Sequence, residues 1–424
     1  MSSNNSLLTI GSCATVLALL PVYPARAAFL EDSHMYFDAR NFYMNRDFRD
    51  PLRDAPARRK NENKKKSEEW GQSLVLRFES GFTDGLVGFG LDTTGVLGIK
   101  LDGGGGTRGA GSWPYNYSTG KSPDEVTYAG VAAKAKISKT QVAVGTVQPY
   151  LPILWRNDSR LLTQTFEGAY LQSEDVKDAK IQAGHLVSTR LRDSSGNSEM
   201  LAFADGITGV VKSDSFDFVG GNYTFSPTLS AAYYYSNLES NYDQHYVGLI
   251  HKLPITDKVT FSSQFRYFKS DNLGQTNVDN RYAGAMFTLY NGVHSVALGY
   301  QDLSGETGFP YVAGGADPYT FNSMLYSVFL RTNEKSWQAK YEFDFASVGL
   351  PGLSLVSRYV EGDGFKVAGQ SAKESEVDVD LAYVVQSGPL QGLRFQWRTG
   401  KYWSDRLADG DENRFIVNYT YKFW

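Results

Sequence analysis

Residues 393–424, LRFQWRTGKYWSDRLADGDENRFIVNYTYKFW, contain two stretches in which apolar and polar residues alternate around an acidic loop. In the first stretch Phe395 and Trp397 alternate with Arg394 and Arg398. One alternating set is Leu393, Phe395, Trp397, Phe415, Val417, Tyr419, Tyr421 and Phe423, and the other is Arg394, Gln396, Arg398, Arg414, Ile416, Asn418, Thr420 and Lys422. Successive side chains of a β-strand point to opposite faces, so these strands have one aromatic face and one polar, cationic face.

Two such strands alone would also fit a soluble sheet, in which the apolar face is the core. The same alternation, however, recurs along nearly the whole chain, and no stretch with the period of an amphipathic helix is present to cover the apolar faces. A chain of this kind can cover its apolar faces with lipid. The pattern therefore predicts an all-β protein, an antiparallel transmembrane β-barrel.

Composition narrows the class of protein further. Mean hydropathy is -0.35 although aromatic residues make up 14% of the chain, and no run of about 18 apolar residues follows the amino-terminal segment. These values exclude a helical membrane protein and suit a barrel that is apolar at every second position. The formal net charge of -4 argues against a nucleic-acid partner.

The amino-terminal segment reads as a secretory signal. An apolar region over residues 7–20 is followed by Ala25-Arg26-Ala27, which predicts cleavage before Ala28. We therefore expect two parts, a signal peptide over residues 1–27 and a barrel over residues 28–424. Arg26 is the only charged residue of the signal, so its removal changes the net charge from -4 to -5. Cys13, the only cysteine, would be lost with it.

Alternation bounded by turn residues predicts 18 strands. They are expected at residues 34–44, 70–80, 85–100, 127–138, 139–147, 164–173, 177–188, 216–225, 228–238, 242–253, 258–269, 280–290, 294–302, 336–346, 352–361, 376–386, 390–402 and 413–423. A rival count of 20 adds residues 199–211 and 321–331. With 18 strands the longest connections meet at one end and the tight turns at the other, as in outer-membrane barrels with long extracellular loops and short periplasmic turns. This asymmetry favours 18.

The inward set of the predicted strands is rich in cations. Arg394, Arg398, Arg414, Arg358, Lys340 and Arg40 fall on this face, and closure places the first strand beside the last. These side chains would form a basic strip along the lumen, where several shallow sites in series suit the passage of anions and Arg can hold a carboxylate with two hydrogen bonds. The alternative is that the same cations pair with Glu342, Asp378 and Asp380 and only stabilise the wall. Pattern alone leaves both interpretations open.

Residues 148–163 form the third long connection. Its large and polar side chains, among them Trp155, Arg156, Ser159 and Arg160, would narrow the lumen if the loop folds inward.

Several short motifs resemble the OprD family of Gram-negative outer-membrane porins. The resemblance runs from about residue 29 to the end and rests on these stretches: Asp38-Ala39-Arg40-Asn41-Phe42-Tyr43, Glu79-Ser80-Gly81-Phe82-Thr83, Gly88-Phe89-Gly90, Ser159-Arg160-Leu161, Ala183-Gly184-His185, Lys335-Ser336-Trp337-Gln338-Ala339 and Tyr383-Val384-Val385-Gln386-Ser387-Gly388-Pro389. It implies an 18-stranded barrel in the outer membrane, a constricting third loop, and an arginine ladder for uptake of small carboxylates such as amino acids or aromatic and other organic acids. It also suggests a monomer or weak homotrimer surrounded by outer-membrane lipid.

The resemblance extends to individual positions. Arg40 and Arg46 match an early arginine pair, Ser159 and Arg160 the constriction loop, and Arg398 and Arg414 the ladder of the last strands. Gln396 departs from the pattern, because another ladder arginine is expected there. The substrate-binding residues predicted from pattern and resemblance together are Arg40, Arg46, Ser159, Arg160, Lys340, Arg358, Arg394, Arg398 and Arg414.

Two other functions compete with that of a channel. An outer-membrane enzyme needs a nucleophile, a His and an orienting group at one site, but only five His are present and no catalytic motif or metal-binding cluster occurs in the sequence. We therefore expect no enzyme activity, no metal and no cofactor. A structural or adhesive barrel is the second rival, because fold does not determine function. Ion conductance would distinguish it from a channel.

Overall fold

The structure is a computed structural model that describes residues 26–49, 66–103, 109–115, 121–209, 211–314 and 318–424. Eighteen strands form one antiparallel sheet, as predicted. They are β1 (His34–Phe48), β2 (Lys66–Glu79), β3 (Gly88–Gly103), β4 (Glu125–Ile137), β5 (Thr140–Val147), β8 (Thr165–Ser173), β9 (Ala179–Arg190), β12 (Phe216–Ser226), β13 (Leu229–Leu238), β14 (Tyr242–Pro254), β15 (Val259–Asn272), β16 (Asp279–Asn291), β17 (His294–Gly305), β19 (Lys335–Asp344), β20 (Leu353–Asp363), β23 (Glu374–Val384), β24 (Arg394–Ser404) and β25 (Gly410–Lys422).

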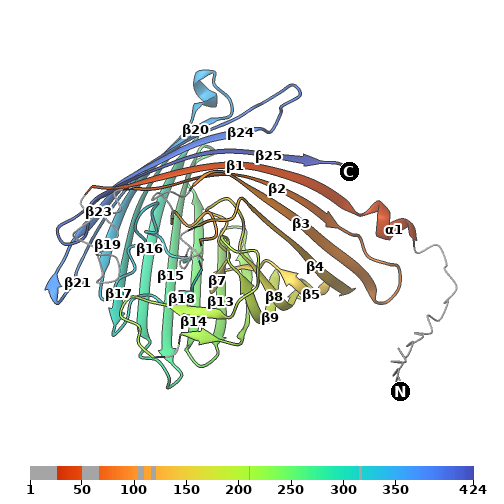
Figure 1. Cartoon of the computed structure of the whole chain (residues 1–424), viewed down its shortest axis with the longest axis horizontal. Helices are drawn as coiled ribbons and strands as arrows, with labels where there is room; N and C mark the ends of the chain where they lie inside the picture. Colours follow the sequence, from red (N-terminus) through yellow and green to blue (C-terminus); the bar gives the residue numbers. More distant parts are fainter. Residues whose placement is uncertain (1–25, 50–65, 104–108, 116–120, 210, 315–317) are drawn as a thin grey trace, which may run out of the picture.

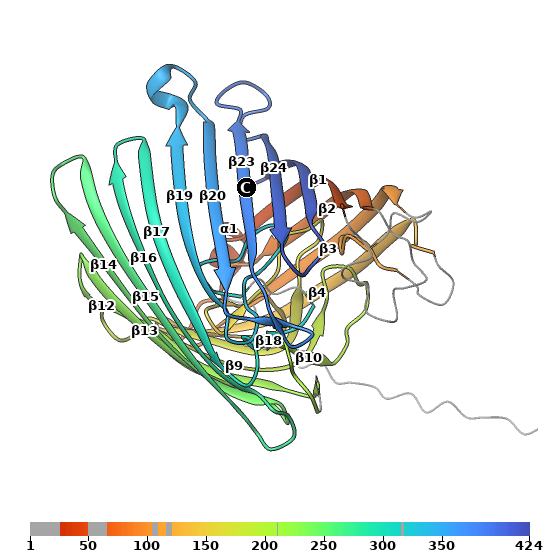
Figure 2. The same ribbon diagram turned by 90° about the vertical axis from the view of Figure 1, so that its left-hand side faces the viewer.

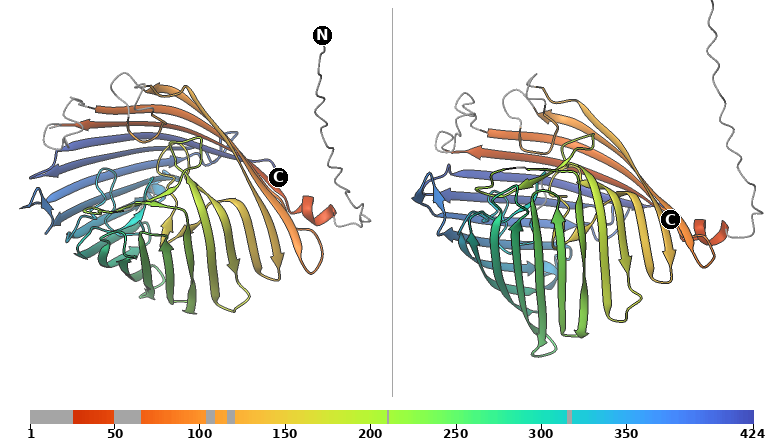
Figure 3. Two further views of the ribbon diagram at one scale, coloured as in Figure 1. Left: turned by 60° about the horizontal axis from the view of Figure 1, so that its bottom comes forward. Right: turned by 90° about the horizontal axis from the view of Figure 1, so that it is seen from below.

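The sheet closes on itself. Each strand pairs with the next one in this order, and β1 also pairs with β25, where Arg40 is opposite Asn418 and Arg46 is opposite Glu412. Figures 1 and 3 show the first and last strands side by side. Closure pairs the edges that would otherwise expose backbone N–H and C=O groups to hydrocarbon. The prediction of a closed barrel of 18 strands is confirmed.

The connections differ in length between the two ends of the barrel. One end carries tight turns such as the one between β16 and β17, where Gly292 has a φ of 60° that favours glycine. These turns lie at the top of Figure 2, and the longest connections lie at the other end. By the asymmetry of outer-membrane barrels, the long connections face the exterior.

The two segments of the rival count do not join the barrel. Among its described residues the first contains one short strand, β10 (Met200–Phe203), which pairs with β11 (Lys212–Ser213) and β18 (Tyr311–Val312) in a separate small sheet. Residues 321–331 contain no strand. The helices of the described residues are α1 (Arg26–Glu31) and the 3-10 helix η1 (Phe345–Val348), and none of them is long and apolar enough to cross a membrane. Of the predicted signal peptide, residues 1–25 lie outside the described part of the chain.

The alternation of the strands is oriented as predicted. On β25 the side chain of Phe415 is 50% exposed on the outer wall, whereas its neighbour Arg414 is 3% exposed and points inward. On β24 Phe395 and Trp397 are likewise exposed on the outer wall. The aromatic face therefore meets lipid, and the cationic face meets the lumen.

One half of the lumen is packed with aromatic side chains. Inward residues of β12 to β17, including Tyr246, Phe268 and Tyr282, form a buried cluster with Phe309 from the connection that follows β17. Arg266 of β15 holds this connection in the lumen, because its guanidinium lies 3.6 Å from the ring centre of Tyr319 and donates to the carbonyl oxygens of Tyr319 and Thr320. The open space of the barrel is therefore displaced toward the opposite wall.

The third loop, residues 148–164, also folds inward. It contains the two-residue strands β6 (Tyr150–Leu151) and β7 (Leu154–Trp155), and Leu161 and Leu162 pack in a buried cluster with Phe42 of β1. Arg40 of β1 donates to the carbonyl oxygen of Asp158 at 2.9 Å. A constricting third loop is thus part of the observed fold.

Candidate functional site

The predicted basic strip is present on the wall opposite the aromatic packing. It runs over β19, β20, β24, β25 and β1, and the strand register places cations directly beside one another. Arg398 of β24 is opposite Arg414 of β25, and Lys340 of β19 is opposite Arg358 of β20. Like charges opposite each other in a sheet are destabilising. The wall therefore has to compensate these cations with carboxylates or with a bound anion.

Carboxylates on the same face supply part of this compensation. Lys340 Nζ lies 2.8 Å from Glu342, Arg358 Nη2 lies 3.0 Å from Asp378, and Arg398 Nε lies 2.9 Å from Asp380. Glu342, Asp378 and Asp380 are the partners predicted from the sequence if the cations of the strip only stabilise the wall. Arg358 and Arg398 nevertheless also face open space in the lumen. Pairing and a basic lining are thus combined in the same side chains.

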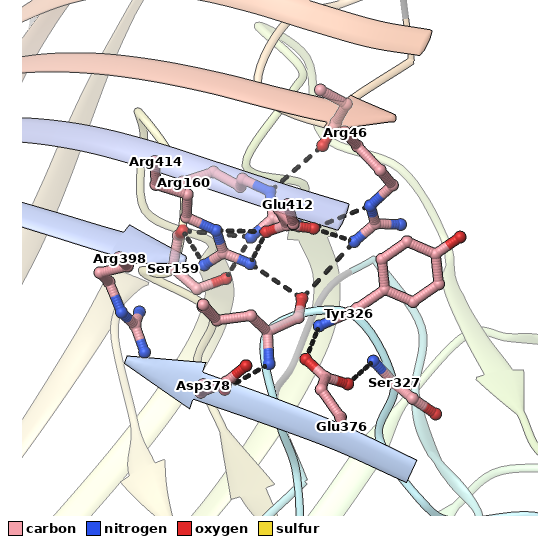
Figure 4. Close-up of polar contacts among 12 residues, drawn as sticks. Arg46, Ser159, Arg160, Tyr326, Ser327, Glu376, Asp378, Arg398, Glu412 and Arg414 are labelled. Carbon is pink, nitrogen blue, oxygen red and sulfur yellow. Dashed lines mark hydrogen bonds and ion pairs between the residues drawn. The ribbon is translucent and has the colours of Figure 1, made fainter. Parts of the chain in front are cut away.

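Glu412 of β25 is the centre of the most buried ion cluster of the strip. Its side chain is fully buried and accepts from Nε of Arg46 at 2.7 Å and from Nε of Arg414 at 2.5 Å. Figure 4 shows the two guanidinium groups on either side of this carboxylate. One carboxylate thus positions two arginines from adjacent strands of the barrel closure.

The third loop adds two of the predicted residues to this cluster. Ser159 accepts at its carbonyl oxygen from Nη1 of Arg414 at 3.4 Å, and its hydroxyl accepts from Nη1 of Arg192 at 3.1 Å. Arg160 donates from Nε to the carbonyl oxygen of Ala110. Burial and the neighbouring charges of Arg414 and Arg192 lower the pKa of the Arg160 guanidinium well below its usual value. An anion bound here would oppose that shift, so the protonated guanidinium and the anion would stabilise each other.

A second segment in the lumen was not expected from the sequence as part of the site. Residues 323–328, here called the inner segment, are held to β23 by carboxylates that accept from backbone N–H groups. Leu325 donates to Asp378 at 3.1 Å, and Tyr326 and Ser327 donate to Glu376 at 2.7 and 2.8 Å. The alternation of Glu374, Glu376, Asp378 and Asp380 on β23 was the available signal that this face is acidic.

The inner segment also meets the arginines. The carbonyl oxygen of Leu325 accepts from Nη2 of Arg414 at 3.0 Å and from Nη2 of Arg46 at 3.5 Å. The Arg46 guanidinium lies 4.5 Å from the ring centre of Tyr326, a cation–π contact. Figure 4 shows this segment between β23 and the cluster around Glu412. The site is therefore enclosed by the wall, the third loop and the inner segment.

Together these elements enclose a cavity of about 510 Å³. In the part of the chain that the structure describes, six arginines line it and no acidic residue does. The six are Arg46, Arg160, Arg192, Arg358, Arg398 and Arg414. Apolar and aromatic side chains line it as well, among them Phe203, Tyr311, Met324 and Val328, and Phe203 is 49% exposed. The cavity thus offers guanidinium groups and apolar surface to the same solute.

A second cavity of about 250 Å³ shares Arg358, Arg398 and Leu325 with the first. It is also lined by Lys340 and by Glu342, Asp378 and Asp380. The two cavities therefore adjoin at Arg358 and Arg398, and the second one is a space of mixed charge. Sites in series of this kind permit entry without permanent capture.

The remaining predicted residues lie outside the first cavity. Lys340 lines only the second one, and Arg40 contacts the third loop. Arg394 is exposed at the periplasmic end of β24 and lines neither cavity. Between Arg394 and Arg398, Gln396 donates from Nε2 to both carboxylate oxygens of Asp380. At the position where a further ladder arginine is expected, the wall therefore has the neutral amide of Gln396.

Sequence reasoning missed Arg192, Phe203 and Tyr311, because they lie in long connections whose path has no periodic signal. Among the described residues, no group of three or more His, Cys, Asp or Glu could hold a metal ion. The two cavities are lined by guanidinium, carboxylate and apolar groups.

Comparison with known proteins identifies the architecture. The family model described as "outer membrane porin, OprD family" matches residues 27–423. The porin-like protein GalP of Pseudomonas putida is 33% identical over 422 residues, covering 96% of this chain and 98% of its own. The crystal structure of Pseudomonas aeruginosa OpdQ is 41% identical with a TM-score of 0.84, covering 94% of this chain and 100% of its own.

A structure of Pseudomonas aeruginosa OpdK with vanillate is 32% identical with a TM-score of 0.84, covering 93% of this chain and 100% of its own. These relatives and neighbours are channels, not enzymes. The chain therefore belongs to the OprD family of porins, and its barrel is a channel of the Gram-negative outer membrane.

Proposed function

We propose that the channel selects small carboxylates with an apolar or aromatic body and passes them along the basic strip by passive diffusion. The observation that carries this proposal is the cavity of about 510 Å³, which six arginines and no described acidic residue line. A unit charge 4 Å away is worth about 1 kcal/mol in bulk water and about 4 kcal/mol at an effective dielectric constant of 20. A few guanidinium groups thus suffice for transient capture of an anion.

The proposed substrate-binding residues have separate roles. Arg46, Arg160, Arg398 and Arg414 attract the carboxylate in the first cavity, and Ser159 holds the third loop against Arg414. Arg358 and Arg398 pass the solute to Lys340 in the second cavity. Arg40 and Arg394 then extend positive charge toward the periplasmic end of the strip.

The apolar body is inferred from the other lining residues. Phe203 of β10 and Tyr311 of β18 are partners in the small inner sheet, and their ring centres lie 5.2 Å apart. A flat apolar solute can contact these rings while its carboxylate meets an arginine. The structure of the relative OpdK with vanillate, an aromatic carboxylate, supports the same class of substrate for this chain. A free ammonium group is disfavoured in the first cavity, where like charges surround it.

The test compares benzoate with benzamide, which has a similar shape and no charge, in vesicles that contain the purified channel. We expect the wild type to pass benzoate at least tenfold faster than benzamide. Replacing Arg358 and Arg398 together by Gln should remove most of this preference, because it removes the two guanidinium groups that both cavities share.

Lys401→Gln is the matched control, because Lys401 lies on the outer face of the same strand as Arg398. It should leave the preference for benzoate unchanged. Equal passage of benzoate and benzamide by the wild type would contradict the proposed selectivity. A folded protein without ion conductance would instead favour a structural or adhesive barrel.

We also propose that residues 1–27 are a secretory signal. The apolar region and the Ala25-Arg26-Ala27 site support cleavage before Ala28. Amino-terminal sequencing of the protein isolated from outer membranes should begin at Ala28, and a protein that begins elsewhere would contradict this assignment.

A further inference from the structure

The outer wall carries a hollow that the channel function does not use. It lies over β14 to β17, measures about 480 Å³ and is lined almost entirely by apolar side chains. The strand register explains it: Ala283 is flanked by Tyr267 and Asp302, and Ala285 is flanked by Phe265 and Tyr300. Two small side chains between larger ones leave a groove along the outer face of β16.

A second hollow continues this groove toward the exterior. It measures about 440 Å³, shares Tyr267, Ala283 and Asp302 with the first, and adds the polar residues Arg281, Asn333 and Lys335. The strands β14 to β17 lie side by side in Figure 2, with the long connections at this end. The groove is therefore apolar along the wall and polar at its extracellular end.

The charged residues that line the second hollow are two cations, Arg281 and Lys335, and one carboxylate, Asp302. Lys335 pairs with Asp302 at 3.3 Å, and Lys269 pairs with Asp271 at 2.6 Å. Arg281 is exposed, lies opposite Lys269, and has no acidic partner among the described residues. An uncompensated guanidinium at the edge of an apolar wall is suited to an anionic head group, and Arg can bind phosphate with two parallel hydrogen bonds.

The outer face of β24 and β25 carries large side chains instead. There Trp397 and Phe415 stack with ring centres 6.2 Å apart, whereas the outer face of β16 has the small residues Ala283 and Ala285. The groove over β16 thus differs in side-chain size from this part of the lipid-facing wall.

We propose that this groove binds a phosphorylated lipid of the outer leaflet, with an acyl chain along Ala283 and Ala285 and a phosphate at Arg281 and Lys335. The occupant has to be a membrane lipid, because the groove is continuous with the lipid-facing wall of the barrel. It has to carry negative charge, because the uncompensated group at its polar end is a cation. The lipid would bind the channel at a defined site rather than as an interchangeable neighbour.

Native mass spectrometry of the full-length barrel in detergent tests this proposal with diphosphoryl lipid A and with its dephosphorylated form, which has the same acyl chains. A basic residue near a membrane surface is worth about 1 kcal/mol, which is about a fivefold change in affinity. We expect Arg281→Gln to weaken binding of diphosphoryl lipid A about fivefold and to leave the dephosphorylated lipid unaffected. Ala283→Phe, which fills the groove, should weaken both lipids.

Two variants serve as matched controls. Arg406→Gln removes an exposed cation from another extracellular connection, and Ala133→Phe enlarges an exposed alanine on β4. Both should bind as the wild type does. Equal affinity for the two lipids, or wild-type affinity of Arg281→Gln for diphosphoryl lipid A, would overturn the proposal. If Ala283→Phe does not show the gel mobility of a folded barrel, the proposal is still tested by the affinities of the wild type and of Arg281→Gln for the two lipids.

Discussion

The two halves of the lumen differ in the side chains that fill them. Inward residues of β12 to β17 form a dry aromatic core with the connection after β17, whereas the wall from β19 to β1 carries paired and unpaired charges around open space. Apolar packing stabilises the fold in proportion to the surface that it buries, but it leaves no room for a solute. Buried charges contribute little net stability, but they attract a ligand. The comparison predicts that stability resides mainly in one half and selectivity in the other.

The largest expected effect on stability is in the aromatic half. Phe268 is fully buried, and its ring centre lies 4.6 Å from Tyr246 and 4.9 Å from Phe309. Phe268→Ala should lower the free energy of unfolding by about 3 to 5 kcal/mol, because it leaves a cavity in a packed core. Denaturant titration of the barrel in lipid vesicles measures this change.

Phe265→Ala is the matched control, because Phe265 lies on the same strand and faces lipid. Lipid can fill the space that it leaves, so the loss of stability should be smaller. The benzoate preference of Phe268→Ala should remain, provided that the variant folds. Equal losses for the two variants would mean that the aromatic half is no more important for stability than the outer wall.

Glu412→Gln tests the charged half at its centre. The change leaves Arg46 and Arg414 without their shared carboxylate, and breaking a buried ion pair costs about 3 kcal/mol or more. It also increases the positive potential of the cavity, so the reversal potential in a salt gradient should shift toward greater anion selectivity. Stability and anion selectivity are thus expected to change in opposite directions.

Asp411→Asn provides the comparison for this variant. Asp411 is the neighbour of Glu412, and its 3.4 Å ion pair with Arg49 is partly exposed. Such pairs are worth at most about 1 kcal/mol, so unfolding should change little. Unchanged anion selectivity in Glu412→Gln would show that this cluster is structural and does not face the ion path.

Glu376→Gln addresses the attachment of the inner segment. The Glu376 carboxylate accepts from the N–H groups of Tyr326 and Ser327, and hydrogen bonds to a charged group are worth about 1.5 to 3 kcal/mol. Backbone amide exchange in residues 323–328 should therefore become about tenfold faster or more, with little change in exchange of the barrel strands. Glu361→Gln, on the strand β20, is the control and should leave this segment protected.

The number of strands could be predicted from the sequence because the alternation of apolar and polar residues is a local signal that is present in every strand. Trp397 and Arg398, for example, differ in the solvent that they face simply because they are neighbours on one strand. The path of the connections has no such signal. Arg192, Phe203 and Tyr311 reach the cavity through contacts between segments that are far apart in the chain. Their position depends on tertiary packing.

The site was predictable to the extent that it lies on strands. The alternation along each strand placed Arg358, Arg398 and Arg414 on the lumen face. It could not distinguish a ladder from structural ion pairs, because Asp378 and Asp380 fall on the same face. The inner segment was rejected as a strand, and its role as a wall of the cavity follows from hydrogen bonds to Glu376 and Asp378 that only the three-dimensional structure contains.

The smallest expected effect comes from filling the gap at Gln396. Its amide donates to Asp380, which also pairs with Arg398, so Gln396→Arg adds a cation beside a carboxylate that is already shared. Asp380 compensates part of the new charge, so the binding free energy of a carboxylate should improve by about 1 kcal/mol. The benzoate concentration that reduces the single-channel current by half should therefore fall about fivefold. Benzamide should show no change. A loss of benzoate affinity would mean that Asp380 pairs with the new arginine in place of Arg398. The ion pairs between side chains of the wall, more than the number of cations, would then control selectivity in the charged half.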